Sequence, residues 1–175
     1  GQYNVPIRLL SSFEKGVGTL ISYEDPLMEG SGIRGLSHEE AQVLVKISNV
    51  PMQSNVLSAI MTQLSAVGVR LDMLSQLSQS GCSMVMFVLS EEELPMVVAI
   101  LQKLQLQFAE LSFECSAAKA KIAMIGAGLG QCPDIVQRVY GILAEEKVEV
   151  HMLQTSELRL TILIDDQHWR RVLAC

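Results

Sequence analysis

The sequence predicts an α+β protein in which one small module occurs twice. The first copy consists of residues 43–47, a loop, a helical run and residues 69–75. The second copy has the same order: residues 122–125, a loop, a helical run and residues 148–154. The offset is roughly 78 residues, well above the 20–50 or so residues that are typical of solenoid repeats. The pattern therefore indicates a duplicated small domain with two matching loops.

The first copy begins with a strand and a helix. Four apolar residues at helical spacing define one face of that helix: Val56, Ile60, Leu64 and Val67. Ser54 or Asn55 is placed to cap its start, and Gly68 is placed to end it. The expected strands of this copy are residues 42–48, 69–76, 82–89 and 107–114.

A second helix follows the hairpin of the first copy. Ser90 and Glu93 have the spacing of a capping box, in which each residue satisfies a backbone amide of the other. The helix continues through Met96, Ile100 and Leu104. The resulting order, β-α-β-β-α-β, is the ferredoxin-like pattern.

The second copy repeats this order but lacks the last strand. Its expected strands are residues 121–125, 148–154 and 158–164, and Pro133 suits the first position of its first helix. The apolar faces of its two helices are expected at Ile135, Val139, Ile142 and Leu143, and at Trp169, Val172 and Leu173. In its second strand, His151 is expected to be a hydrogen-bonded structural histidine rather than a ligand.

The missing strand suggests how the chain is divided. Residues 31–37 contain an apolar segment, Ile33 to Leu36, without a partner in the first copy. We expect it to complete the second module (residues 117–175), so that the first module (residues 38–116) is inserted within the second. Residues 1–30 read as a connector with short strands at residues 6–10 and 19–21 and a turn at residues 16–18.

The composition excludes several classes of function. The chain has 175 residues, 49% of them hydrophobic, and a formal net charge of -6, which disfavours nucleic acid as a partner. The four cysteines lack zinc-ligand spacing and look like apolar filler in a reducing cytoplasm. No apolar run reaches the roughly 18 residues of a membrane span, so no membrane association is expected.

Several motifs resemble aspartokinases. Residues 121–129, with the Ile-Gly-Ala-Gly turn, and residues 148–164, with the run Thr155 to Leu160, resemble the second ACT module of that family. Residues 6–8, 11–13 and 18–21 resemble the last strands of an amino-acid kinase domain. The resemblance spans nearly the whole chain, as a regulatory half with a short catalytic remnant.

The resemblance implies an allosteric role. In the family, paired ACT modules bind lysine, threonine or both and inhibit the kinase, which phosphorylates aspartate with ATP. It also implies a homodimer formed through the ACT modules and a catalytic domain or subunit as partner. We expect no catalytic residue, metal site or cofactor in this chain, since ATP and magnesium would bind the kinase domain. The chain would be a piece of a longer protein or a separate regulatory subunit that starts near Met28.

The two loops that lead into helices are the candidate effector sites. Free backbone N–H groups and the positive end of the helix dipole suit the carboxylate of an amino acid, while side-chain oxygens and backbone carbonyls suit its ammonium group. The candidate residues are Asn49, Met52, Gln53, Ser54, Asn55, Val56, Asp72 and Gln76 in the first module, and Gln131, Cys132, Pro133, Asp134, Ile135, Glu149 and Val150 in the second.

Both loops depart from the family pattern. Residues 52–55 stand where the family has Asp-Lys-Pro-Gly, and residues 132–134 stand where it has His-Pro-Gly. The first loop thus lacks the acid that pairs with an amino group. A structural dimerisation module whose effector sites have been lost is therefore the main alternative function.

Overall fold

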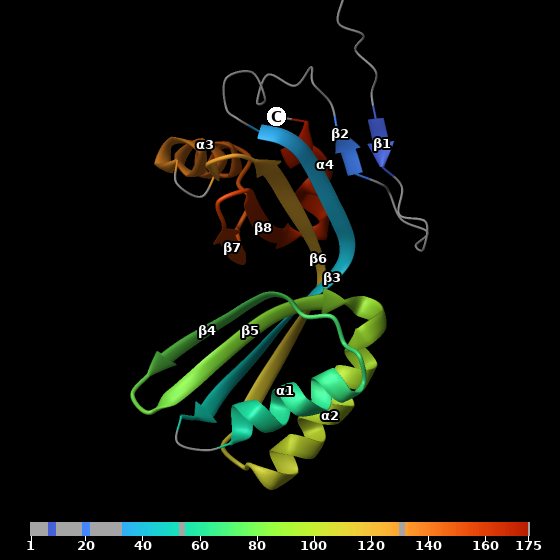
Figure 1. Cartoon of the computed structure of the whole chain (residues 1–175), viewed down its shortest axis with the longest axis vertical. Coiled ribbons are helices and arrows are strands. Elements are labelled where there is room, and N and C mark those ends of the chain that lie inside the picture. The colour runs from blue at the N-terminus through green and yellow to red at the C-terminus, as the bar shows by residue number, and fades with distance from the viewer. Residues whose placement is uncertain (1–6, 10–18, 22–32, 53–54, 130–131, 175) are drawn as a thin grey trace, which may run out of the picture. The chain divides into compact units, whose positions relative to one another are not determined.

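The computed structural model describes residues 7–9, 19–21, 33–52, 55–129 and 132–174. The chain divides into two compact units (Figure 1). Unit 2 is the continuous segment Ala41–Ala118, and unit 1 combines Gly1–Glu40 with Lys119–Cys175. The expected turn at residues 16–18 lies outside the described residues.

Unit 2 is a sheet with two helices on one face (Figure 1). Its strands lie in the order β4-β5-β3-β6, and the pairs β3–β5 and β4–β5 are antiparallel. The elements are β3 (Ile33–Pro51), α1 (Val56–Ala66), β4 (Asp72–Gln79), β5 (Cys82–Ser90), α2 (Leu94–Gln107) and β6 (Ser112–Gly126). This is the strand order of a ferredoxin-like module.

The core of unit 2 lies between this sheet and the two helices. Alternate residues of β3 and β5 are fully or almost fully buried: Val43, Val45, Ile47, Val85, Phe87 and Leu89. They pack against Val56, Ile60 and Leu64 of α1 and against Val97, Leu101 and Leu104 of α2. The alternating apolar residues of the strands and the helically spaced apolar residues of the helices therefore form one apolar layer.

Two residues expected on buried helix faces are exposed. Val67 lies just beyond α1 as its C-cap and is 42% exposed, and Gly68, with a φ of +74°, ends the helix there as expected. Met96 is 39% exposed because the buried stripe of α2 begins one residue later, at Val97. A shift of one residue turns a side chain by about 100° around a helix, which is enough to move it out of the core.

Unit 1 has the same architecture, built from discontinuous parts of the chain. Its strands lie in the order β1-β2-β3-β6-β8-β7, and β6–β8 and β7–β8 are antiparallel pairs. The added elements are β1 (Ile7–Leu9), β2 (Thr19–Ile21), α3 (Pro133–Glu145), β7 (Met152–Thr155), β8 (Arg159–Asp165) and α4 (Trp169–Leu173). Its core combines residues of β6 and β8 with Ile135, Val139 and Leu143 of α3. The predicted α+β class and ferredoxin-like arrangement are confirmed.

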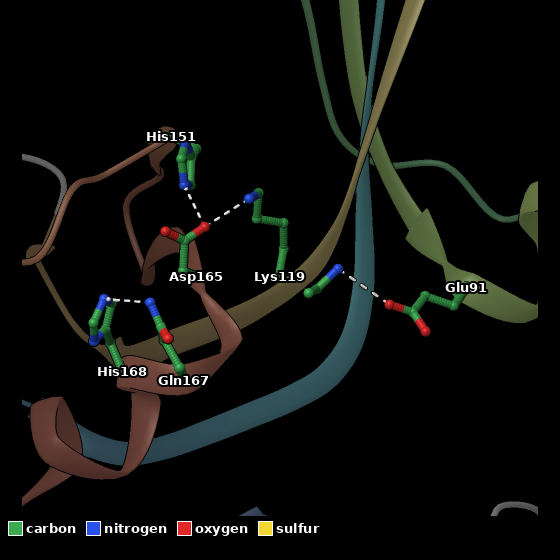
Figure 2. A network of polar contacts seen from close by, with 7 residues as sticks. Glu91, Lys119, His151, Asp165, Gln167 and His168 are labelled. Carbon is green, nitrogen blue, oxygen red and sulfur yellow. Dashed lines mark hydrogen bonds and ion pairs between the residues drawn. The ribbon is translucent and has the colours of Figure 1, made fainter.

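Two long strands run through both units. The segments expected as separate strands, residues 33–36 and 42–48, are continuous in β3, and β6 likewise extends over fifteen residues. Ala41 and Ala118, at the unit boundaries, adopt positive φ values of 53° and 55°. The amide of Ala118 donates a hydrogen bond to Glu91 Oε1 at 3.1 Å, so its irregular backbone has a side-chain partner (Figure 2).

The expected capping box at the start of α2 is confirmed. A single turn of 3-10 helix, η1 (Glu91–Glu93), leads into α2. The Ser90 amide and hydroxyl both donate to Glu93 Oε2, at 3.3 and 3.0 Å, and the Arg70 amide donates to Glu93 Oε1 at 3.0 Å. Although partial burial acts to raise the pKa of Glu93, the hydrogen bonds outweigh it and hold the pKa below its ordinary value.

Replacing Glu93 should therefore weaken unit 2. Glu93→Ala removes the acceptor of two backbone amides, and we expect it to lower the free energy of unfolding by about 1 kcal/mol or somewhat more. Glu92→Ala is the matched control, since Glu92 is exposed and no capping contact is assigned to it. Urea denaturation of both variants measures the difference, and an equal effect of the two substitutions would contradict the capping role.

Candidate functional site

The loop after β3 lies against the tip of the β4–β5 hairpin. The Met52 amide donates to the Gly81 carbonyl at 3.1 Å, and Pro51 pairs with Cys82. Asn49 has a φ of 59° at a register shift near the end of β3, and its Nδ2 donates to Ser112 Oγ at 3.3 Å. We call this region, with the N-terminal end of α1, the unit 2 corner.

A cluster of three polar side chains lies at this corner. Gln76 Nε2 donates to Ser83 Oγ at 3.1 Å and to Ser78 Oγ at 3.3 Å, and the two hydroxyls lie 2.9 Å apart. Gln76 pairs with Val85, a core residue beneath the helices, and Ser78 pairs with Ser83. Because paired residues share a face and faces alternate along a strand, the cluster lies on the helix-bearing face of the sheet.

The N-terminal end of α1 can offer backbone N–H groups to a ligand. Asn55 occupies the N-cap position, and its side chain makes no capping hydrogen bond. Val56 is fully buried and is therefore not open to a ligand. Helix N-terminal amides attract an anion, and the amide oxygen of Gln76, which is not used toward the serines, can accept from a cation. The corner therefore offers complementary groups to a zwitterion.

Asp72 lies far in space from the unit 2 corner. It pairs with Val88, and Val88 pairs with Leu44, seven residues before the end of β3 at Pro51. At about 3.3 Å per residue, this separation is roughly 20 Å. The Asp72 carboxylate accepts instead from the neighbouring Met73 amide at 2.8 Å. The structure thus does not bring Asp72 together with the other candidates of the first module.

The matching corner of unit 1 is held by backbone contacts. The amides of Gly126 and Gly128 donate to the carbonyls of Leu158 and Glu157, each at 2.9 Å. Gly128 has a φ of +77°, which the absence of a Cβ atom permits without strain. Leu129 is fully buried within the core of unit 1. This corner is therefore tied to the β7–β8 turn and filled by an apolar side chain.

The candidates of the second module separate into two groups. Cys132 is the N-cap of α3, Pro133 and Asp134 are exposed in its first turn, and the Ile135 side chain is buried. Glu149 and Val150 precede the His151 amide, which donates to Leu163. Leu163 pairs with Lys121, near the start of the unit 1 part of β6 and five residues before its end at Gly126, so Glu149 and Val150 do not lie at this corner.

Three candidates, Gln53, Ser54 and Gln131, lie outside the described residues. Two residues of the polar cluster, Ser78 and Ser83, did not figure among the candidates. A signal for them was present in the sequence, because each lies one residue outside the pair that flanks a two-residue Ser-Gly turn, so a hairpin brings them opposite one another.

Unit 1 also contains a charged network around Asp165. Asp165 Oδ1 accepts from Lys119 Nζ at 2.6 Å and contacts His151 Nε2 at 2.9 Å (Figure 2). The Lys119 hydrogen bond holds the pKa of Asp165 below its ordinary value; partial burial opposes this effect, and His151 reinforces it. The expected hydrogen bonding of His151 is confirmed. The network joins the middle of β6 and the end of β8 to the segment before β7.

Neither a metal centre nor a membrane span emerges from the described part of the chain. Within it, no three His, Cys, Asp or Glu side chains are grouped as metal ligands would be. No helix in the same part is long and apolar enough to cross a membrane.

Comparisons with known proteins identify the class of fold. Residues 122–175 match the family model of the ACT domain. The regulatory subunit of aspartate kinase from Thermus thermophilus superposes with a TM-score of 0.72 at 18% identity, over 82% of this chain and 95% of that one. The chain therefore has the ACT-type fold of aspartate kinase regulatory regions.

The relatives found by sequence are aspartate kinases. An aspartate kinase of Pseudomonas fluorescens is 28% identical over 170 residues, which are 96% of this chain and 41% of the relative. Escherichia coli aspartokinase III, in complex with lysine and aspartate, has a TM-score of 0.59 at 20% identity over 97% of this chain and 37% of that one. The predicted resemblance to the aspartokinase regulatory region is confirmed. The chain spans about two fifths of the length of the curated relatives it matches.

The Asp165 network should stabilise unit 1 in a pH-dependent manner. Asp165→Asn leaves the nearly buried Lys119 ammonium without its partner, and we expect it to lower the free energy of unfolding by about 2 kcal/mol at neutral pH. Because the folded pKa is depressed, this contribution is present above the ordinary aspartate pKa of about 4 and is lost as the pH falls through the folded value.

Chemical denaturation between neutral pH and about pH 3 measures this dependence. The difference between the wild type and Asp165→Asn should shrink at the acid end. Glu149→Gln, which neutralises an exposed carboxylate of the same unit, should show no comparable difference. A difference that stays constant over the whole pH range would contradict the charge interaction.

Proposed function

We propose that this chain is the allosteric regulatory region of an aspartokinase and that it binds an aspartate-family amino acid, lysine or threonine, at the unit 2 corner. The observation that carries the proposal is the Gln76, Ser78 and Ser83 cluster in the β4–β5 hairpin, whose tip is hydrogen-bonded to Met52 in the loop that leads to α1. The helix end suits the carboxylate of the effector, and the amide and hydroxyl oxygens suit its ammonium group. The lysine complex of the E. coli relative supports this choice of ligand.

Effector binding would act on a catalytic partner. The partner is an aspartate kinase domain or subunit that binds ATP and magnesium, and the assembly is cytoplasmic. An effector inhibits only if it binds one arrangement of the assembly better than the other, and such couplings are typically about 1–3 kcal/mol. Feedback inhibition by lysine or threonine is the regulation that this arrangement would provide.

The second candidate function is a structural dimerisation module without an effector. It is favoured by residues 52–55, which lack an acidic side chain, and by the buried Leu129 in the matching corner of unit 1. The two candidates share the dimer and differ in ligand response. They can therefore be separated by one binding measurement.

A thermal-shift measurement with the twenty amino acids tests the effector. At a hundredfold excess over Kd, lysine or threonine should stabilise the chain by about 2.7 kcal/mol, which corresponds to roughly 5–10 °C in the unfolding midpoint. A flat response to all twenty would favour the structural module.

Matched variants test the location of the site. Gln76→Ala removes an uncharged partner of the effector ammonium, and we expect affinity for the stabilising amino acid to fall about tenfold. Gln102→Ala makes the same change on an exposed position of α2 and should leave affinity unchanged. Isothermal titration calorimetry measures both values, and equal affinities for the two variants would place the effector elsewhere.

The proposed homodimer draws support from the edge of the unit 2 sheet. Strand β4 pairs with β5 alone among the described strands, and it exposes Leu74 and Leu77 by 48% and 59%. An edge strand with exposed leucines favours pairing with another chain, and a two-fold pair of identical edges closes without open ends.

Charged substitutions test this edge. Leu77→Lys should dissociate the dimer, because two lysines would meet near the two-fold axis. Leu106→Lys alters the most exposed large apolar residue among those the structure describes, 89% accessible on α2, and should leave the dimer intact. Sedimentation velocity over a range of concentrations distinguishes these outcomes. A wild-type chain that stays monomeric throughout would contradict the proposal.

A further inference from the structure

The described chain passes between the two units at two places, and both places have an unusual backbone conformation. Ala41 follows the last unit 1 residue of β3, and Ala118 precedes the first residue of β6 that belongs to unit 1. Their φ values are 53° and 55°, although both lie within strands. A residue with a Cβ atom avoids this left-handed region, and such conformations gather at sites of conformational switching.

On the unit 1 side, ion pairs hold both strands close to these two alanines. Glu39 Oε1 lies 3.0 Å from Lys121 Nζ, two residues before Ala41. Lys119, directly after Ala118, lies 2.6 Å from Asp165 Oδ1 through its Nζ. Both lysines are buried. The ion pairs therefore fix β3 as far as Glu39 and β6 from Lys119 onward to the body of unit 1.

On the unit 2 side, two consecutive residues hold the same strands. Gln42, which is buried, pairs with Ser90 in the β3–β5 ladder. The next residue, Glu91, accepts a hydrogen bond from the Ala118 amide through Oε1 at 3.1 Å (Figure 2). Glu91 is itself exposed, so this attachment of β6 depends on a carboxylate that water can reach.

A change of backbone conformation at the two alanines would uncover no core residue. Glu40, Ala41 and Ala118 are all exposed, and so are residues 114–117 of β6. Hinges are a few residues that absorb changes in φ and ψ between rigid parts. We propose that Ala41 and Ala118 form a hinge through which the two units change their relative orientation, and that the Glu91 carboxylate is the latch that holds Ala118 in its left-handed conformation.

Both hinge strands lead to the unit 2 corner. β3 runs from Ala41 to Asn49, and β6 runs from Ser112 to Ala118. At the corner, Asn49 Nδ2 donates to Ser112 Oγ at 3.3 Å and so joins the two strands. Continuous, rigid elements of this kind can carry coupling between distant sites. An amino acid bound at the corner would therefore bias the hinge, a link that rests on the proposed function.

Distances between the units measure the hinge directly. Nitroxide labels are attached to ketone-bearing residues that replace Gln102 of α2 and Gln137 of α3, both of which are exposed, so that the cysteines of the chain are retained. An excess of unlabelled chain removes distances between copies. In pulsed electron paramagnetic resonance, Glu91→Ala should give a broader distance distribution than the wild type, because the latch is lost.

Two control variants keep the latch. Glu92→Ala removes the neighbouring exposed carboxylate, which makes no contact with Ala118. Glu91→Gln removes the charge but keeps an amide oxygen that can accept from the Ala118 amide. Both should give distance distributions close to that of the wild type.

Amide hydrogen exchange tests the latch at the residue itself. Glu91→Ala should accelerate exchange of the Ala118 amide about tenfold, because the amide loses a charged acceptor. Exchange of a core amide of the same unit, Val85, should accelerate less. Equal acceleration at both residues would show general destabilisation of unit 2 and would overturn the latch.

The distance measurement can overturn the hinge in two ways. The wild type could show a distribution as broad as that of Glu91→Ala. Alternatively, Glu91→Ala could lower the unfolding midpoint and leave the distribution unchanged, as a purely structural role of Glu91 predicts.

The link to the corner is tested separately. Lysine or threonine, whichever stabilises the chain, should narrow the distance distribution of Glu91→Ala. Binding without any change in that distribution would overturn the link. A flat thermal-shift response to all twenty amino acids would instead contradict the proposed function, and the hinge would stand on the distances measured without a ligand.

Discussion

The fold depends on two strands, β3 and β6, that each contribute a segment to both units. The β3 segment of unit 1 precedes Ala41, and the β6 segment of unit 1 follows Ala118, so all of unit 2 lies between two neighbouring strands of unit 1. Unit 1 can close its sheet only after the ends of this insertion meet. A folded insertion holds them together, whereas an unfolded one must be closed at an entropic cost that grows slowly with its length. Folding of unit 2 should therefore favour assembly of unit 1.

The same constraint explains the backbone conformation at the boundaries between the two units. A left-handed conformation costs a residue with a side chain about 1–2 kcal/mol, and both Ala41 and Ala118 adopt it. The Glu91 carboxylate accepts from the Ala118 amide and so compensates for part of that cost. Glu91 belongs to the same 3-10 turn as the capping residue Glu93. Three consecutive residues of unit 2 therefore stabilise both the start of a helix and the backbone of β6 at the unit boundary.

Most of the fold could be predicted because its elements follow simple periods. Alternation in residues 43–47 and 85–89 and helical spacing from Val56 to Leu64 all correspond to buried faces. The continuity of β3 and β6 could not be predicted, since residues 37–41 are mostly polar and residues 116–120 are rich in alanine. Their strand conformation is imposed by neighbouring strands, and tertiary context overrides weak local preference.

The site was only partly predictable, because strand register decides which residues meet. The loops could be located from their place before helices. Asp72, however, begins β4 at the end away from the corner, and Glu149 precedes β7, and spacing along the sequence does not reveal this. Register also distinguishes the two corners. Where unit 2 has Gln76 beside Ser78 and Ser83, the repeat aligns Thr155, which pairs with the fully buried Leu160. Within the described residues, the Thr155 side chain makes no hydrogen bond like those of Gln76, and the buried Leu129 fills the unit 1 corner. The duplication has therefore kept the shape of the corner in both units and its polar chemistry in one, which supports a single effector site per chain at unit 2.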